Sequence, residues 1–182
     1  MDYQYSFQIY GNTVPYYHFH YEKEFKEVIR IKNIQEKNRS NRYYFKDGTY
    51  LPQFVNQETA KQFNFNSDYA TFEKAIILII HSFSDEVPKD LDNYYYKPFI
   101  DVIRKLKIIE DDSWEQAGIT NLGSYADNEC IDVYVVPYQF YIYFLSQKLD
   151  YLFNGNYRIS SIKEQEKREE MGNDFFDPDI FS

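Results

Sequence analysis

The spacing of apolar residues alternates along the chain between a period of two and a period near 3.6, so the sequence predicts both strands and helices. Residues 71–83 have a continuous apolar middle, which is typical of a central strand buried on both faces. The expected architecture is therefore an α/β or α+β fold, a mixed β-sheet flanked by helices. The predicted strands span residues 3–10, 13–21, 71–83, 113–120 and 131–136.

Helices are predicted where apolar residues recur at positions i, i+3, i+4 and i+7. The helix after Lys97 has this spacing, and Pro98 fits only in its first turn, where backbone N–H groups have no intrahelical partner. The last helix is apolar almost all round, so it either packs within the monomer or pairs with a second subunit. The predicted helices span residues 22–37, 58–65, 99–106 and 138–153.

A β-hairpin is expected within residues 41–54. Asp47-Gly48 stands there between two aromatic runs, and this dipeptide favours a two-residue turn because glycine tolerates positive φ. Exposed tyrosines of such a hairpin would be suited to stack on unpaired bases. Packing of the same tyrosines against the domain is the alternative.

Acidic side chains gather at both ends of the helix after Lys97. Asp90 and Asp92 precede it, and Asp111 and Asp112 follow it, with Asp112 expected at the start of a strand. Neighbouring carboxylates repel one another, which raises a pKa or calls for a cation. Mg²⁺ meets that demand because it prefers oxygen ligands and keeps part of its water shell. The alternative is a loop with a solvated acidic rim.

One known family carries the same polar residues in the same order. The chain reads Asp90-Leu-Asp92-Asn93, then Lys97, then Asp101 within the helix, then Asp111-Asp112-Ser113 after a hydrophobic stretch. This pattern resembles the signature of the RusA family, the phage-borne resolvases of Holliday junctions, over residues 88 to about 116. The chain departs from the family in one respect: the lysine follows the second aspartate by five positions instead of four.

The resemblance implies a RusA-like, dimer-forming fold and Mg²⁺-dependent endonuclease activity on four-way DNA junctions in phage recombination or replication. It implies that Asp90, Asp92 and Asp112 bind the metal and that these three and Lys97 are the catalytic residues. Mn²⁺ is expected to substitute for Mg²⁺. Branched DNA as substrate, a homodimer, a phage or prophage origin and the cytoplasm of a bacterial host follow from the same resemblance.

Basic residues are densest in and just after the predicted helix 22–37. We expect them to contact DNA phosphates; a solvated helix face is the alternative, because glutamates are mixed in with them. The predicted DNA-binding residues are Lys26, Arg30, Lys32, Lys37, Arg39 and Arg42.

The net charge of −9 opposes a general affinity for DNA, so DNA binding would need a local basic patch or bound metal. Two rival functions stay open. One is a metal-dependent nuclease of the same fold that acts on flaps or forks. The other, which the charge favours, is a catalytically inactive acidic phage protein that binds a protein partner or imitates DNA phosphates.

Histidine and cysteine residues suggest little chemistry at this level. His18 and His20 would face the same side of a strand, a spacing that two metal ligands can use, but partly exposed histidines on an aromatic strand are the alternative. His81 is expected to be a hydrogen-bonded histidine of the central strand. Cys130 is the single cysteine and is expected to be buried or half-buried; it cannot form an internal disulfide, which fits a reducing compartment.

The nuclease domain is expected to span residues 1–155, followed by a charged, acidic-aromatic tail over residues 156–182. From Lys163 onward there are three basic and seven acidic residues. Acidic segments with a few large apolar residues suit docking in a basic, apolar groove, so the tail predicts a contact with a replication protein; disorder without a partner is the alternative. No apolar run is long enough to span a membrane, and no basic–apolar leader opens the chain.

Overall fold

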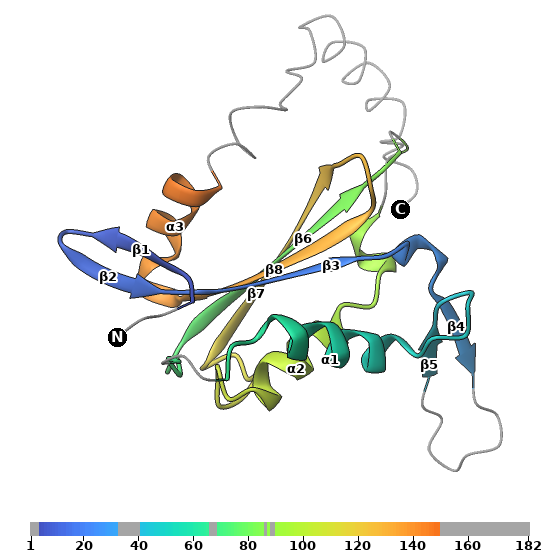
Figure 1. The fold of residues 1–182 in the computed structure, drawn as a ribbon, viewed down its shortest axis with the longest axis horizontal. Coiled ribbons are helices and arrows are strands. Elements are labelled where there is room, and N and C mark those ends of the chain that lie inside the picture. Colours follow the sequence, from blue (N-terminus) through green and yellow to red (C-terminus); the bar gives the residue numbers. More distant parts are fainter. Residues whose placement is uncertain (1–3, 33–40, 66–68, 86, 88–89, 150–182) are drawn as a thin grey trace, which may run out of the picture. The chain divides into compact units, whose positions relative to one another are not determined.

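The computed structural model describes residues 4–32, 41–65, 69–85, 87 and 90–149 (Figure 1). Their strands are β1 (Ser6–Ile9), β2 (Asn12–Pro15), β3 (Tyr17–Glu22), β4 (Ile29–Lys32), β5 (Asn41–Tyr44), β6 (Ala75–Phe83), β7 (Ala117–Tyr125) and β8 (Cys130–Pro137). The helices are α1 (Leu51–Gln62), α2 (Lys97–Lys105) and α3 (Tyr141–Lys148), with short 3₁₀ helices at Phe25–Glu27, Leu91–Asn93 and Tyr138–Phe140. The chain divides into two compact units, Met1–Gln147 and Lys148–Ser182. The predicted domain boundary at residue 155 and the predicted tail lie outside the described residues.

Four strands form the central sheet, in the order β3-β8-β6-β7. β8 is antiparallel to both β3 and β6, whereas β6 and β7 are parallel. The predicted mixed β-sheet flanked by helices is therefore confirmed. Parallel neighbours need a crossover connection, and α2 lies in the one between β6 and β7. All nine residues of β6 are buried, as expected of a central strand.

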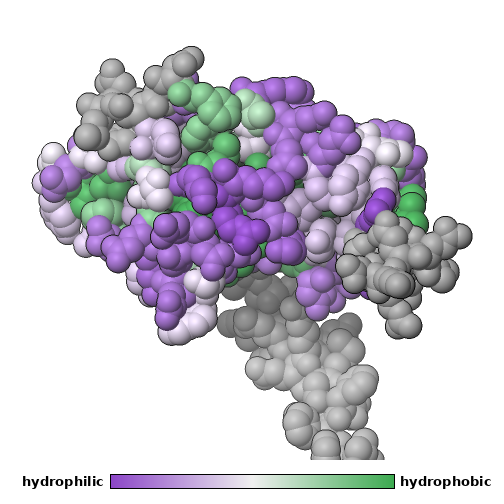
Figure 2. Space-filling model, turned by 90° about the horizontal axis from the view of Figure 1, so that it is seen from below, coloured by the Kyte–Doolittle hydropathy of each residue, from purple (hydrophilic) through white to green (hydrophobic). Residues whose placement is uncertain are grey.

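Helices α1 and α2 lie on one face of the sheet (Figure 1). Side chains of a strand alternate between faces, so this face presents every second residue, among them Phe19, Ile77 and Val133. They pack with Phe99 and Ile103 of α2, which are separated by four positions and are both almost fully buried. The outer surface on this side is mainly hydrophilic (Figure 2), as expected for helices that bury one stripe.

Both ends of α2 determine where the polar motif lies. Pro98 stands in the first turn, as predicted. At the other end Lys107 has a positive φ of 59°, and its N–H and that of Ile108 donate to the carbonyls of Arg104 and Ile103. This arrangement satisfies the last helical carbonyls and reverses the chain. Residues 109–112 consequently return beside the helix they have just left.

The opposite face of the sheet contacts α3 and the β1–β2 hairpin. The ring of Phe144 lies 5.4 Å from that of Tyr134 and 5.8 Å from that of Phe7, between ring centroids. The helix predicted over residues 138–153 is observed as a 3₁₀ turn followed by α3, and residues beyond 149 lie outside the described part. Within α3 Phe144 is buried and Ile142 is 71% exposed. Only one side of the described helix is therefore packed within the monomer.

The helix predicted over residues 22–37 is wrong. The chain forms a 3₁₀ turn at Phe25–Glu27 and then strand β4, which pairs antiparallel with β5. The β-branched residues Val28, Ile29 and Ile31 favour an extended backbone, and Ile29 and Ile31 fall on the same side of the strand. The lysine and glutamate residues around them favour a helix and led to the helix prediction, but they did not determine the structure.

The hairpin predicted within residues 41–54 is only partly correct. A turn is present at Asp47-Gly48, where Gly48 has φ +84° and the Phe45 N–H donates to the Thr49 carbonyl at 2.9 Å. Beyond a single bridge at Tyr50, however, the second arm is helix α1, with proline in its first turn. The predicted helix 58–65 overlaps only the end of α1, and the strand that pairs with β5 is β4.

Two further boundaries differ from prediction. Strand β7 begins at Ala117, because residues 113–116 form a turn in which Ser113 accepts hydrogen bonds from the N–H groups of Gln116 and Ala117. Asp112 therefore lies five residues before the strand instead of at its start. At its other end β7 continues to Tyr125, five residues beyond the predicted end of the strand at residue 120.

Candidate metal and DNA-binding site

Asp90 and Asp92 flank the start of the 3₁₀ helix Leu91–Asn93, near the carboxyl ends of the parallel strands β6 and β7. The Leu91 side chain lies over Gly123 of β7: a Cβ added to this glycine would stand 3.7 Å from Leu91 Cδ2 and 3.8 Å from the Phe83 ring. Both aspartates are exposed. A hydrogen bond with the Asp90 carboxyl, reinforced by repulsion between the two groups, raises the pKa of Asp92. The pair therefore concentrates negative charge, which a bound cation would neutralise.

Lys97 and Asp112 belong to a second cluster, built along the exposed edge of α2. The Lys97 ammonium lies 2.9 Å from Asp101 Oδ1 and 3.9 Å from Asp112 Oδ2. Arg104 lies 3.3 Å from Asp112 and 3.6 Å from Asp111. The hydrogen bond that Lys97 donates to the Asp101 carboxylate is the main reason that the pKa of Lys97 is raised. Sequence reasoning did not identify Arg104, although it stands on the same helix edge, seven positions after Lys97.

The four predicted catalytic residues thus form two pairs, Asp90 with Asp92 and Lys97 with Asp112. Mg²⁺–oxygen bonds of about 2.1 Å place two ligand oxygens at most about 4.2 Å apart. Among the described residues, the only group of three histidine, cysteine or acidic side chains with ligand atoms all within 4.8 Å is His20, Cys130 and Asp132. In this arrangement Asp112 therefore cannot share one directly bound ion with Asp90 and Asp92.

A groove of about 700 Å³ runs beside the Asp90–Asp92 pair. We call it the acidic groove. It brings part of the predicted metal site next to part of the predicted DNA-binding set, because Lys26 and Arg30 also line it. Its lining consists of Phe25, Lys26, Val28, Arg30, Tyr43, Leu51, Asp90, Asp92, Asn93, Tyr94, Tyr95, Tyr96, Phe99 and Ile131.

Two tyrosines of the acidic groove stack on each other. The rings of Tyr43, from β5, and Tyr95, from the segment before α2, lie 3.9 Å apart with an angle of 10° between their planes. Both side chains are half-buried. Of the hairpin tyrosines predicted to offer stacking surfaces, only Tyr43 lines this groove, and it also packs against the core, as the alternative proposed. Tyr44 and Tyr50 line a separate hollow.

Strand alternation separates the predicted basic residues. Arg30 pairs with Tyr43 across the β4–β5 hairpin, so both side chains lie on the side of the acidic groove. Arg42 pairs with Ile31 and lies on the other side, where it lines a separate hollow with Tyr44 and Asp47. Lys32 is the last residue of β4, whereas the predicted residues Lys37 and Arg39 lie outside the described part.

A buried polar network lies behind the acidic groove. His81 of β6 is fully buried, and its Nδ1 lies 3.0 Å from the Tyr96 hydroxyl and its Nε2 3.0 Å from Glu129 Oε1. Glu129 Oε1 also accepts the Lys26 N–H at 2.9 Å. The network links the central strand to both walls of the groove. The expectation that His81 is a hydrogen-bonded strand histidine is confirmed, whereas Glu129, which stands in a polar loop of the sequence, was not anticipated.

His18 and His20 do share one side of β3, as predicted. Both bond to a residue that the sequence did not suggest: Asp132 Oδ1 lies 2.7 Å from His18 Nε2 and 2.9 Å from His20 Nδ1. Cys130 is buried on the neighbouring strand. This cluster lies on the sheet face opposite to α1 and α2.

Comparisons with known proteins add no family to this geometry. A scan against protein-family models finds no matching model, and a search of curated proteins finds no matching relative. None of the helices in the described part of the chain has the length and apolar character that crossing a membrane would require.

Proposed function

We propose that the protein is a RusA-like, Mg²⁺-dependent endonuclease that hydrolyses phosphodiester bonds of branched DNA, with the four-way junction as its substrate. The observation that carries this proposal is the acidic groove. It combines a carboxylate pair with unrelieved repulsion, two basic side chains and an aromatic stack. Metal-ion nucleases need these components: oxygen ligands, phosphate contacts and a surface for bases.

The chain's own residues divide the work as follows. Lys26 and Arg30 bind backbone phosphates, because neither has an ion-pair partner among the described residues and both face the groove. The Tyr43–Tyr95 stack provides a face for an unpaired base at the branch point. Asp90 and Asp92 hold the metal, which when bound supplies charge neutralisation and an activated water. Lys97 donates to the phosphate after leaving Asp101.

The spacing of five positions between Asp92 and Lys97, one more than in the RusA family, is compatible with these proposed roles. Lys97 stands at the first position of α2 and is paired with Asp101 one helical turn on, at 2.9 Å. Its partner Asp112 is held in the same cluster by Arg104. We propose that Asp112 would assist metal binding from this second cluster, without directly contacting an ion held by Asp90 and Asp92.

Symmetric cleavage of a four-way junction needs two active sites related by a two-fold axis, so the proposal includes a homodimer. It also includes a phage or prophage origin, action in the bacterial cytoplasm, and docking of the tail on a replication protein. Substrate choice depends on surfaces outside the carboxylates, so the nearest alternative function is a nuclease of the same fold that acts on flaps or forks.

Wild-type protein incubated with a labelled synthetic four-way junction should give paired symmetric nicks that require Mg²⁺ or Mn²⁺. A linear duplex of the same sequence is the matched control and should stay intact. If flaps and forks are cut as efficiently as the junction, the four-way junction is not the specific substrate. Absence of cutting at every metal concentration would contradict the proposed endonuclease activity.

One observation favours a second candidate, an inactive acidic protein that binds a partner or mimics DNA. Asp112 is engaged by Arg104 and Lys97 and does not converge with the Asp90–Asp92 pair. Junction binding without cutting would point to an inactive DNA-binding protein. If the protein neither binds nor cuts the junction, the result would point to a protein partner for the acidic surface.

The β4–β5 hairpin offers a charge-matched test of the DNA contact. Arg30→Ala should weaken junction binding and lower the slope of log affinity against log salt by about one, because one phosphate contact is lost. Arg42→Ala removes the same charge from the other side of the hairpin and should leave both quantities near wild type. Fluorescence anisotropy at several salt concentrations measures both. Equal effects of the two variants would contradict the assignment of the groove.

A further inference from the structure

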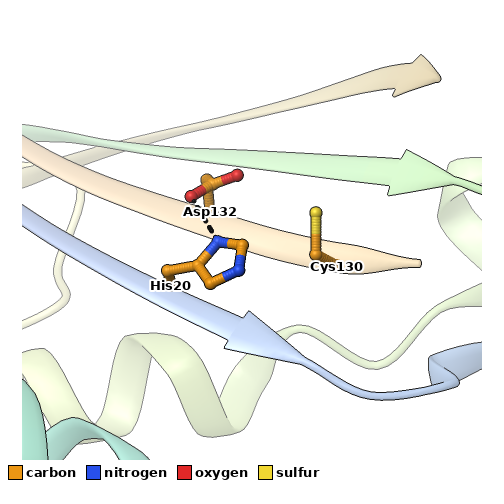
Figure 3. Close-up of side chains that lie close together, drawn as sticks. All are labelled: His20, Cys130 and Asp132. Atoms are coloured by element: carbon orange, nitrogen blue, oxygen red, sulfur yellow. Dashed lines mark hydrogen bonds and ion pairs between the residues drawn. The ribbon is translucent and has the colours of Figure 1, made fainter. Parts of the chain in front are cut away.

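A compact set of metal-ligating side chains lies on strands β3 and β8, apart from the acidic groove. His20 pairs directly with Asp132 in the β3–β8 register, and Cys130 stands two positions before Asp132, so all three side chains share one sheet face. Figure 3 shows the Cys130 and Asp132 side chains rising from β8 and the His20 ring reaching over from β3. An imidazole nitrogen, the thiol sulfur and a carboxylate oxygen all lie within 4.8 Å of one another.

We propose that His20, Cys130 and Asp132 form a binding site for a Zn²⁺-class transition-metal ion. The donor set decides the kind of metal: imidazole and thiolate bind borderline-soft ions such as Zn²⁺ and Co²⁺, whereas Mg²⁺ prefers oxygen. This site is therefore chemically distinct from the Asp90–Asp92 pair. It does not rest on the nuclease proposal.

His18 acts as a positioning residue for this site. Its Nε2 lies 2.7 Å from the same Asp132 oxygen that His20 Nδ1 approaches at 2.9 Å. The ring of His18 is itself fixed by stacking on Tyr134, at 4.3 Å and 6°. Hydrogen bonds of this kind orient a ligating carboxylate and are worth about 10- to 100-fold in metal affinity. Three protein ligands leave the fourth position of a tetrahedral ion to solvent.

Access and local charge both suit a cation. The His20 side chain is 48% exposed and that of Asp132 20% exposed, so an ion can enter from solvent. Burial opposes ionisation of Asp132, but the hydrogen bonds from His18 and His20 outweigh it and hold the pKa below its usual value. Burial raises the pKa of the Cys130 thiol, and the nearby charge of Asp132 adds to that effect. Asp132 therefore offers an ionised oxygen, and the Cys130 thiol releases its proton when a metal binds.

Metal binding here would join the edge strand of the sheet to its neighbour. β3 has a single sheet partner, β8, among the described strands. An ion held by His20 from one strand and by two residues from the other adds a cross-link near the open end of that pair. Bound metal should therefore raise the temperature of unfolding of the full chain, because it binds only the folded state.

The test uses full-length protein freed of metal with a chelator. Co²⁺, the spectroscopic substitute for Zn²⁺, should bind in a one-to-one ratio, give a thiolate-to-cobalt charge-transfer band and be displaced by Zn²⁺. Cys130→Ser should abolish that band and weaken Zn²⁺ binding by about 100-fold or more, beyond the loss expected for an orienting partner. His18→Gln should keep the band and weaken binding less.

Asp92→Asn is the control, because it alters the other candidate metal site and should leave the band and the Zn²⁺ affinity unchanged. His20→Gln, at an exposed edge position, repeats the test should Cys130→Ser disturb folding, which circular dichroism reports without metal. A missing charge-transfer band in wild-type protein, or an unchanged Zn²⁺ affinity in both ligand variants, would overturn the site.

Discussion

Asp92→Asn is expected to reduce Mg²⁺-dependent junction cleavage by about a thousandfold, which corresponds to about 4 kcal/mol of transition-state stabilisation. Asparagine keeps the shape of the side chain and can still hydrogen-bond to Asp90 at the start of the 3₁₀ helix. It removes one of the two negative charges that we propose to bind Mg²⁺. The expected loss therefore lies in the chemical step and not in folding.

Binding should change in the opposite direction. Without metal, Asp90 and Asp92 would repel the phosphates that we propose Lys26 and Arg30 to bind in the same groove. Removing one carboxylate should leave metal-free junction binding equal to or slightly tighter than that of wild type. Single-turnover cleavage and metal-free anisotropy measure the two effects separately.

Asp127→Asn provides the matched control, because it makes the same substitution at an exposed residue that does not line the groove. Cleavage by this control should match wild type. Undiminished cleavage by Asp92→Asn would contradict the assignment of Asp92 as a metal ligand. Loss of cleavage together with loss of binding would point to a structural role of the residue.

The sequence predicts those parts of the fold that neighbouring residues determine. The nine buried residues of β6 follow from an apolar run, and the start of α2 follows from Pro98 and the spacing of Phe99 and Ile103. β4 is different, because its residues are compatible with either structure and its partner β5 lies beyond a connection of eight residues. Pairing between distant segments overrode the local composition there.

The same distinction applies to the site. Asp90 and Asp92 meet because they are two residues apart, so the raised pKa of Asp92 follows from their closeness in the sequence. The contact of Asp112 with Lys97 depends on the chain reversal at Lys107, which has a backbone conformation usually taken by glycine. Asp132 reaches His18 and His20 only through the β3–β8 register. Register is set by packing of whole faces and is not visible in a short motif.

His81→Leu is expected to destabilise the protein by about 3–5 kcal/mol, the cost of leaving a buried charge without its partner. The His81 and Glu129 side chains are 0% and 2% exposed and lie 3.0 Å apart. Glu129 Oε2 has no hydrogen-bond partner within the described part, so His81 supplies the only side-chain hydrogen bond to this carboxylate there. Leucine fills a similar volume but donates no hydrogen bond. Urea denaturation measures the loss as a lower midpoint at unchanged slope.

A second substitution separates the charge from packing. In the double variant His81→Leu/Glu129→Gln the buried group is neutral, and its amide can still accept the Lys26 N–H that Glu129 Oε1 accepts at 2.9 Å. The double variant should therefore recover part of the stability lost in His81→Leu. Destabilisation by His81→Leu of less than about 1 kcal/mol, or a further loss in the double variant, would show that Glu129 does not depend on His81. Recovery would identify the imidazole as the group that allows a carboxylate to lie beneath the acidic groove and hold the backbone of Lys26 in its wall.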